Sequence, residues 1–145
     1  MVDLLAEYIP ISELIDSVIN SALSNEIADK LKYCIQEEAT NRVYSYEPKV
    51  LNSRRKSSGG LIDSGNMETW VSDRTLTLYN STGLQNLFGG DDGSPLTPII
   101  EDGVSAYHQP YPRPFMDEAL DKLVDEGIAD RELGNALRAA GFDVT

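Results

Sequence analysis

The chain of 145 residues is long enough to bury one hydrophobic core, so we expect a single domain over residues 1–145. Hydrophobic residues make up 41% of the sequence, which is typical of a folded protein despite the net charge of −12. The acidic excess repels phosphate and therefore argues against general binding of nucleic acid.

The sequence contains one cysteine, Cys34, and one histidine, His108. An intrachain disulfide and metal sites built from several cysteines or histidines are thereby excluded. The apolar stretches are far shorter than the roughly 20 residues of a membrane-spanning helix, and the start of the chain lacks the pattern of a signal peptide. We therefore expect a soluble protein with no membrane partner.

The first predicted element is a long amphipathic helix that runs from Ile11 to about Asn41. Its apolar residues recur at intervals of three and four, as one helical face requires; they are Ile11, Leu14, Ile15, Val18, Ile19, Ala22, Ile27, Leu31, Cys34 and Ile35. Ser24-Asn25 interrupts this stripe, and both side chains compete for backbone hydrogen bonds, which favours a kink or a restart at this point. Of the two, we expect one helix that bends here.

Strands are predicted after the helix. Residues Val43 to Tyr46 have β-branched and aromatic side chains and are followed by Pro48, which favours a short strand. Two alternating runs, Met67 to Val71 and Thr75 to Tyr79, flank a turn-like Ser72-Asp73-Arg74 and predict a β-hairpin. Together these segments predict a small antiparallel sheet of at least three strands.

Two flexible loops are predicted, near residues 49–60 and 80–112. The first is basic and ends in Gly59-Gly60, and the second holds five of the eleven glycines and four of the seven prolines. Within the second, Thr97 as N-cap, Pro98 at the first helical position and Gly103 at the end predict one short helix.

The end of the chain predicts two helices. After Pro114, an amphipathic helix begins with Phe115 on its apolar face and ends at Gly127. Asp130 can cap a short terminal helix that Gly141 stops. The predicted fold class is therefore α+β.

None of the candidate motifs assembles a catalytic, cofactor-binding or metal site. Asp91-Asp92-Gly93 lacks the alternating ligands of a calcium loop, so a solvated or subunit-contacting loop is favoured over a metal site. Glu47-Pro48-Lys49 is similar to part of a metal-dependent nuclease site, but such a site needs a further acid and a positive surface. His108 has no accompanying nucleophile. We expect no enzyme and no cofactor, with a metal-dependent nuclease as the alternative from a different class.

Four short segments carry a resemblance to a known family. In chain order they are Gly60-Leu61-Ile62-Asp63 leading through Asn66, then Leu76-Thr77-Leu78-Tyr79-Asn80, Ile99-Ile100-Glu101-Asp102-Gly103 and Arg113-Pro114-Phe115. Their order and spacing resemble the tail-completion or neck proteins of long-tailed bacteriophages, in the branch found in phages of Gram-positive bacteria. The terminal helix after Asp130 and the stretch from Ser81 to Ser94 depart from that pattern.

The resemblance implies a structural protein of the virion neck that is assembled in the cytoplasm of the host bacterium. Its subunits would form a homo-oligomeric ring that contacts a head-closure or connector protein on one side and a tail-terminator or tail-tube protein on the other. Genome DNA would pass through only as cargo, and the family implies no catalytic residues. The alternative within the same class is another head–tail junction protein, either a head-closure protein or a tail terminator.

The two loops are the expected contact segments of such a ring, because segments that order on contact suit a head-to-tail interface. A basic loop on an acidic protein can also pair with the acidic surface of a neighbouring subunit. Arg113 would anchor the second loop and Phe115 would fill the core. The predicted subunit-interface residues are Lys49, Arg54, Arg55, Lys56, Asp91, Asp92, Glu101, Asp102 and Arg113.

Overall fold

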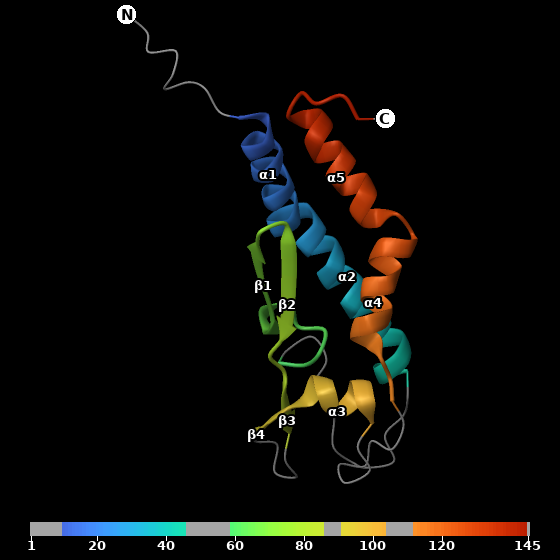
Figure 1. Cartoon of the computed structure of the whole chain (residues 1–145). Helices are drawn as coiled ribbons and strands as arrows, with labels where there is room; N and C mark the ends of the chain where they lie inside the picture. The colour runs from blue at the N-terminus through green and yellow to red at the C-terminus, as the bar shows by residue number, and fades with distance from the viewer. Residues whose placement is uncertain (1–9, 46–58, 86–90, 104–111, 145) are drawn as a thin grey trace, which may run out of the picture.

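The structure, a computed structural model, describes residues 10–45, 59–85, 91–103 and 112–144, with the side chains of residues 84–94 left out of the description. It combines helices with two small antiparallel sheets, so the predicted α+β class is confirmed. Figure 1 shows an elongated molecule in which the first and last helices lie at one end and β3, β4 and α3 at the other.

A continuous long helix, residues 11–44, forms the backbone of the fold. It comprises α1 (Ile11–Ala22), a first π-turn (Leu23–Ile27), α2 (Ala28–Ala39) and a second π-turn (Thr40–Tyr44). The prediction of one long helix that is perturbed near Ser24-Asn25 is confirmed, because this pair lies inside the first π-turn.

Side-chain hydrogen bonds accompany the first π-turn. Ser24 Oγ donates to the carbonyl of Asn20 at 2.8 Å, and Asn25 Nδ2 donates to the carbonyl of Ser21 at 2.9 Å. A π-turn adds one residue to a helical turn. Buried Ala22 and buried Ile27, five residues apart, therefore both face the core.

The predicted strand from Val43 to Tyr46 is wrong. The helix continues to Tyr44 through the second π-turn, in which Thr40 Oγ1 donates to the carbonyl of Gln36 at 2.7 Å. Val43 is buried in the core, so its β-branched side chain packs there from a helix and is not part of a sheet. Tyr46 lies outside the described residues.

The predicted hairpin is confirmed. Strands β1 (Met67–Ser72) and β2 (Thr75–Asn80) pair in antiparallel register from Met67↔Asn80 to Ser72↔Thr75. Asp73 and Arg74 connect them with φ angles of 48° and 59°, as a two-residue type I′ turn requires. The expected sheet of three or more strands is wrong, because the strands in the described part of the chain form two separate pairs.

Part of the predicted irregular loop 80–112 is ordered into regular elements. They are β3 (Gly83–Gln85), β4 (Asp91–Pro95) and α3 (Leu96–Asp102). The predicted stop at Gly103 is confirmed by its φ of 71°. Thr97 is not the N-cap, because the helix already begins at Leu96, directly after Pro95.

The two C-terminal helices are α4 (Phe115–Asp125) and α5 (Ile128–Ala139). Gly127, with a φ of 68°, allows the sharp turn between them and confirms the predicted end of α4. The predicted terminal helix is confirmed, but Asp130 is not its cap and the helix is not short: α5 starts two residues earlier and spans 12 residues, one more than α4.

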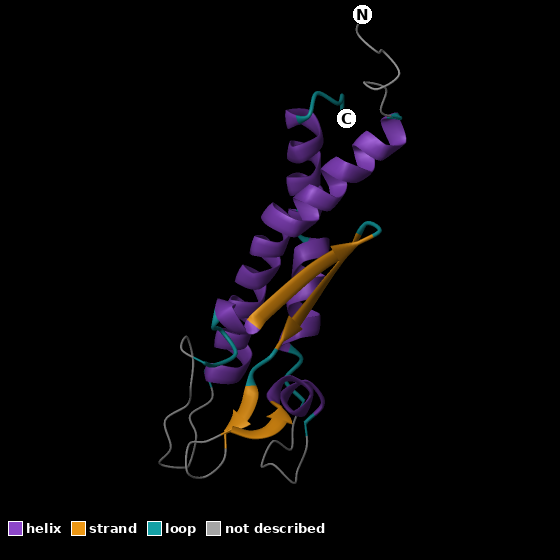
Figure 2. Cartoon of the chain, turned by 90° about the vertical axis from the view of Figure 1, so that its left-hand side faces the viewer, coloured by secondary structure: helices purple, strands orange, loops and turns teal. Residues whose placement is uncertain are grey.

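Two layers pack on the long helix. Helix α4 lies along α2, and α5 contacts α1 and the first π-turn, whereas β1 and β2 also contact that π-turn. Figures 1 and 2 show the hairpin and the α4–α5 pair on different sides of the long helix. The core between these layers includes Phe115, Ile35, Ala39, Leu61, Ala119 and Leu123, and the predicted core position of Phe115 is confirmed.

Helix α4 offers a matched test of this packing, because Leu123 is 4% exposed and Leu120 is 51% exposed. We expect Leu123→Ala to lower the free energy of unfolding by about 2–5 kcal/mol, since it leaves a cavity in the core. Leu120→Ala should cost roughly 0.5 kcal/mol or less. Denaturant unfolding followed by circular dichroism measures both, and equal losses would contradict the assignment of the two faces.

Candidate interaction surface

A buried polar cluster, which we call the polar junction, lies at the base of the hairpin. Its members are Gly60, Leu61, Asn66, Asn80 and Thr82, and both Asn80 and Thr82 are fully buried. Asn80 Nδ2 donates to the carbonyl of Leu61 at 3.0 Å, and Asn80 Oδ1 accepts from Thr82 N at 3.1 Å and lies 2.6 Å from Thr82 Oγ1. Asn66 Nδ2 donates to the carbonyl of Gly60 at 3.2 Å. Because buried polar groups are costly unless paired, the cluster fixes the start and end of the hairpin.

The segment before the hairpin is held by its own side chains. The Asp63 carboxylate accepts hydrogen bonds from the backbone N–H groups of Gly59 and Gly65 at 2.7 and 2.9 Å, and these bonds lower the pKa of Asp63. Gln36 Nε2 donates to the carbonyl of Ile62 at 2.9 Å, which ties the segment to α2. The end of the predicted flexible loop 49–60 is therefore a defined turn at residues 59–60.

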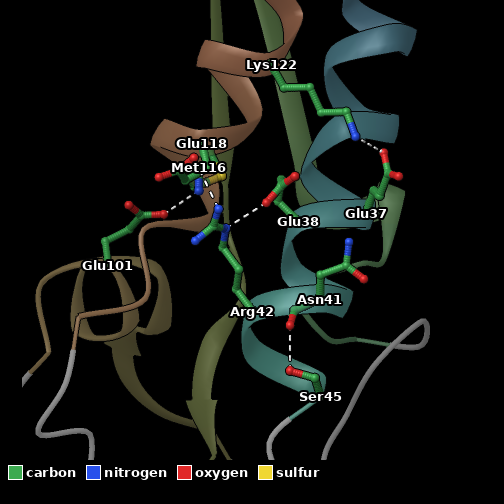
Figure 3. Close-up of polar contacts among 9 residues, drawn as sticks. All are labelled: Glu37, Glu38, Asn41, Arg42, Ser45, Glu101, Met116, Glu118 and Lys122. Atoms are coloured by element: carbon green, nitrogen blue, oxygen red, sulfur yellow. Dashed lines mark hydrogen bonds and ion pairs between the residues drawn. The ribbon is translucent and has the colours of Figure 1, made fainter.

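Backbone and side-chain bonds also tie α3 to the start of α4. Arg113 N donates to the carbonyl of Ile100 at 2.8 Å, and the anchoring role of the Arg113 side chain stays a prediction. The Glu101 carboxylate accepts from Met116 N in the first turn of α4 (Figure 3). Burial raises the pKa of Glu101, against the opposing effect of the hydrogen bonds from Met116 and Asp117.

Ion pairs join α2 and the second π-turn to α4 (Figure 3). Arg42 contacts Glu38 at 2.7 Å and Glu118 at 3.2 Å. Lys122 Nζ donates to the carboxylate of Glu37 at 2.5 Å. These contacts place two cations of an acidic chain at the α2–α4 boundary, where they offset the repulsion between carboxylates on both helices.

The structure brings the four resemblance segments together. The segment from Gly60 to Asn66 and the end of β2 meet in the polar junction. The backbone N–H of Leu96 donates a hydrogen bond to the carbonyl of Thr82 at 3.0 Å, which joins the start of α3 to the polar junction. Helix α3 in turn contacts the entry to α4. Segments spread over more than fifty residues of sequence thus form one continuous support beneath the hairpin.

The predicted interface residues are spread over several parts of the chain. Lys49, Arg54, Arg55 and Lys56 lie outside the described residues, and Asp91 and Asp92 are described only as backbone of β4. Asp102 is exposed at the end of α3, whereas Glu101 binds within its own chain. Their role in subunit contacts stays a prediction.

The residues weighed for catalysis, Glu47, Lys49 and His108, also lie outside the described part of the chain. Among the described residues, no group of three or more His, Cys, Asp or Glu side chains is arranged to hold a metal ion. In the same residues, no helix has the length and apolar character needed to cross a membrane.

The structure reveals a surface that the sequence did not single out, the outer face of the hairpin. It consists of the side chains that alternate away from the long helix, all of them exposed: Glu68, Trp70, Ser72, Thr75, Thr77 and Tyr79. Trp70 is 53% exposed and Tyr79 is 49% exposed. The two rings lie on neighbouring strands at diagonal positions, because Trp70 pairs with Thr77 and Tyr79 is two residues further along.

A second apolar surface lies on α4. Leu120 is 51% exposed and Val124 is 58% exposed, and their spacing of four residues places them on one helical face. Exposed Asp117, Asp121 and Asp125 flank them. The alternation of side chains along the strands and the helical periodicity of α4 could have indicated both surfaces. This would have required knowing how many helices and strands pack on the hairpin and on α4.

The comparisons with known proteins give one match. The family model described as YomN matches residues 5–139, which is nearly the whole chain. The name is that of a phage-derived family and supports a phage origin. No curated protein matches the chain, and no solved structure does.

The contact between Glu101 and α4 can be tested by two substitutions. Glu101→Ala leaves the N–H of Met116 without its acceptor and should lower the free energy of unfolding by about 1–2 kcal/mol. Glu101→Gln keeps an acceptor oxygen and should cost less than half as much. Thermal or denaturant unfolding of the two variants measures the difference.

A comparison of the wild type with Glu101→Gln tests the raised pKa of Glu101. Because the pKa of Glu101 is higher in the folded than in the unfolded state, this carboxyl stabilises the fold fully at pH values below its ordinary pKa of 4.5. The stabilisation is lost as the pH rises through the pKa of the folded state. The stability of the wild type relative to Glu101→Gln should therefore increase as the pH falls toward 4.5. A difference that does not change with pH would contradict the burial of this carboxyl.

Proposed function

Since the chain belongs to the YomN family, we propose that it is a structural protein of a phage virion, a tail-completion subunit of the neck. Copies of it form a ring between the head connector and the tail. The observation that carries this proposal is the pair of uncovered apolar surfaces on different sides of the long helix.

A ring subunit of the neck needs one surface for its neighbours in the ring and another for the junction proteins on either side of the ring. Contacts between copies close into a ring when the rotation permits. The outer face of the hairpin exposes Trp70 and Tyr79, and α4 exposes Leu120 and Val124. Exposed aromatic residues are typical anchors of protein interfaces.

The internal contacts of the described residues also support a structural role. Glu101, Asp63, Arg42 and Lys122 are each engaged in capping, turn formation or ion pairing within the chain. Such groups are used for holding elements together and not for chemistry on a substrate. The predicted contact residues in the basic segment, from Lys49 to Lys56, add a charge that can meet the acidic surface of a neighbour.

The partners follow from this place in the virion. One side of the ring meets a head-closure or connector protein, and the other meets a tail-terminator or tail-tube protein. Genome DNA passes through the ring, and the net charge of −12 keeps its phosphates from adhering to the wall. Assembly takes place in the cytoplasm of the host. A head-closure protein or a tail terminator is the alternative within this class.

Phage particles made without this protein test the proposal directly. We expect filled heads and finished tails that remain separate in electron micrographs, because the joining ring is missing. Supplying the wild-type protein in trans should restore tailed particles. Normal tailed particles in its absence would overturn the proposed role. Cleavage of plasmid by the purified protein with magnesium or manganese, lost on changing Glu47 or Lys49, would favour the nuclease instead.

The outer face of the hairpin has its own test with a matched control. Tyr79→Ala and Trp70→Ala should each weaken self-association about tenfold or more, as expected for central interface aromatics. Tyr33→Ala removes another exposed tyrosine, 63% exposed on α2, and should leave association unchanged. Analytical ultracentrifugation measures association, and denaturant unfolding should show losses of about 1 kcal/mol or less in all three monomers. An equal effect of Tyr33→Ala would contradict a specific role of the hairpin.

A further inference from the structure

Both strands of the hairpin have an open edge. In the described part of the chain, β1 and β2 pair only with each other. In an antiparallel pair that is closed by a two-residue turn, every second residue turns its backbone N–H and C=O outward. The register assigns these outward groups to Thr69 and Val71 on β1 and to Leu76 and Leu78 on β2.

The edge of β2 lacks the features that prevent strands from pairing between molecules. Natural edge strands are commonly protected by lysine, proline, an inward charge or a bulge. The segment Thr75–Asn80 contains no charged residue and no proline, and its register with β1 is unbroken over six pairs. It consists of threonine, leucine, tyrosine and asparagine, of which threonine and tyrosine favour strands. This edge is therefore competent to accept another strand.

We propose that the β2 edge of one copy pairs with the β1 edge of the next copy, so that the hairpins of the ring form one continuous antiparallel sheet. The inference rests on the proposed ring and names its contact. The two edges lie on opposite sides of the same hairpin, so each copy presents one of each and the pairing is head-to-tail. A neighbouring β1 would place its Trp70 beside Thr77 or Tyr79 of β2, as the hairpin does internally.

Charge explains why the occupant is a second copy and why the contact lies here. Copies with a net charge of −12 repel one another, so self-association requires a surface of low charge. The twelve strand residues of β1 and β2 include one charged residue, Glu68. Of the two charged side chains of the turn, Arg74 pairs with Asp16 of α1 and Asp73 is exposed. The apolar face of α4 is in contrast flanked by three aspartates, which makes it a poorer contact for another acidic copy.

Disulfide trapping between introduced cysteines tests this arrangement. Ser72→Cys, on the β1 edge, is mixed in turn with Thr75→Cys and with Thr77→Cys, both on the β2 edge. The first mixture tests the register that places Trp70 beside Thr77, and the second tests the register that places Trp70 beside Tyr79. Each molecule carries one introduced cysteine, so a bridge between these cysteines must join two molecules. The natural Cys34 is buried, and burial raises the pKa of its thiol, so background cross-linking is low.

Mild oxidation followed by non-reducing electrophoresis distinguishes the outcomes. Pairing of β2 with β1 predicts a covalent dimer in at least one of the two mixtures and monomers for each of the three single variants alone. Dimers from a single variant alone would indicate pairing of like edges and would overturn the head-to-tail arrangement. Monomers from both mixtures, under conditions in which the wild type forms rings, would overturn edge pairing and leave the ring intact.

Two further results separate this inference from the proposed function. Thr77→Lys introduces a charge on the outer face of β2 and should abolish ring formation, whereas Asn41→Lys at an exposed position of the second π-turn should not. A wild-type protein that stays monomeric at millimolar concentration, together with no cross-linked dimer in either mixture, would overturn edge pairing. If the cross-linked dimer forms but particles without the protein are normal, the neck role fails and the edge contact stands.

Discussion

The packing of one helix on two sides is the constraint on which the rest of the structure depends. Residues 11–44 form this helix, and its first π-turn contacts both the hairpin and α5. A regular α-helix would place Glu26, four residues after buried Ala22, on the core face. The extra residue of the π-turn places Ile27 there instead, and both layers can then bury apolar surface against the same segment.

The hairpin is stable only because of this support. Two strands alone are marginal in water, and the inner face of β1 and β2 must therefore be covered by the long helix. The apolar contact alone does not fix the orientation of the hairpin, and the hydrogen bonds of the polar junction do. Its buried Asn80 and Thr82 must satisfy their hydrogen bonds at one position of the segment before β1, so the hairpin is held at a fixed angle and register. Its outer face and both edges are left exposed as a consequence.

Local signals predicted the parts of this fold that depend on a few neighbouring residues. The type I′ turn at Asp73-Arg74, the glycine stops at Gly103 and Gly127, and the disturbance at Ser24-Asn25 each arise from local backbone chemistry. The end of the long helix could not be predicted in this way, because Val43 is helical through its tertiary burial. Of the candidate surface, the alternation of the hairpin was readable from sequence. The open edges of the hairpin in the described part of the chain were not, because a third strand was expected beside it.

The distribution of charge decides which surfaces of the protein can contact another copy. The ion pairs at the α2–α4 boundary neutralise Lys122 and Arg42 within the chain, so these two cations attract another acidic copy less strongly. In the proposed ring, attraction between copies can also come from apolar contact and backbone hydrogen bonds, neither of which depends on net charge. The hairpin offers both in one place, with aromatic rings on its outer face and, among the described residues, no further strand paired along its edges. An acidic protein can in this way remain repelled from DNA and still bind itself.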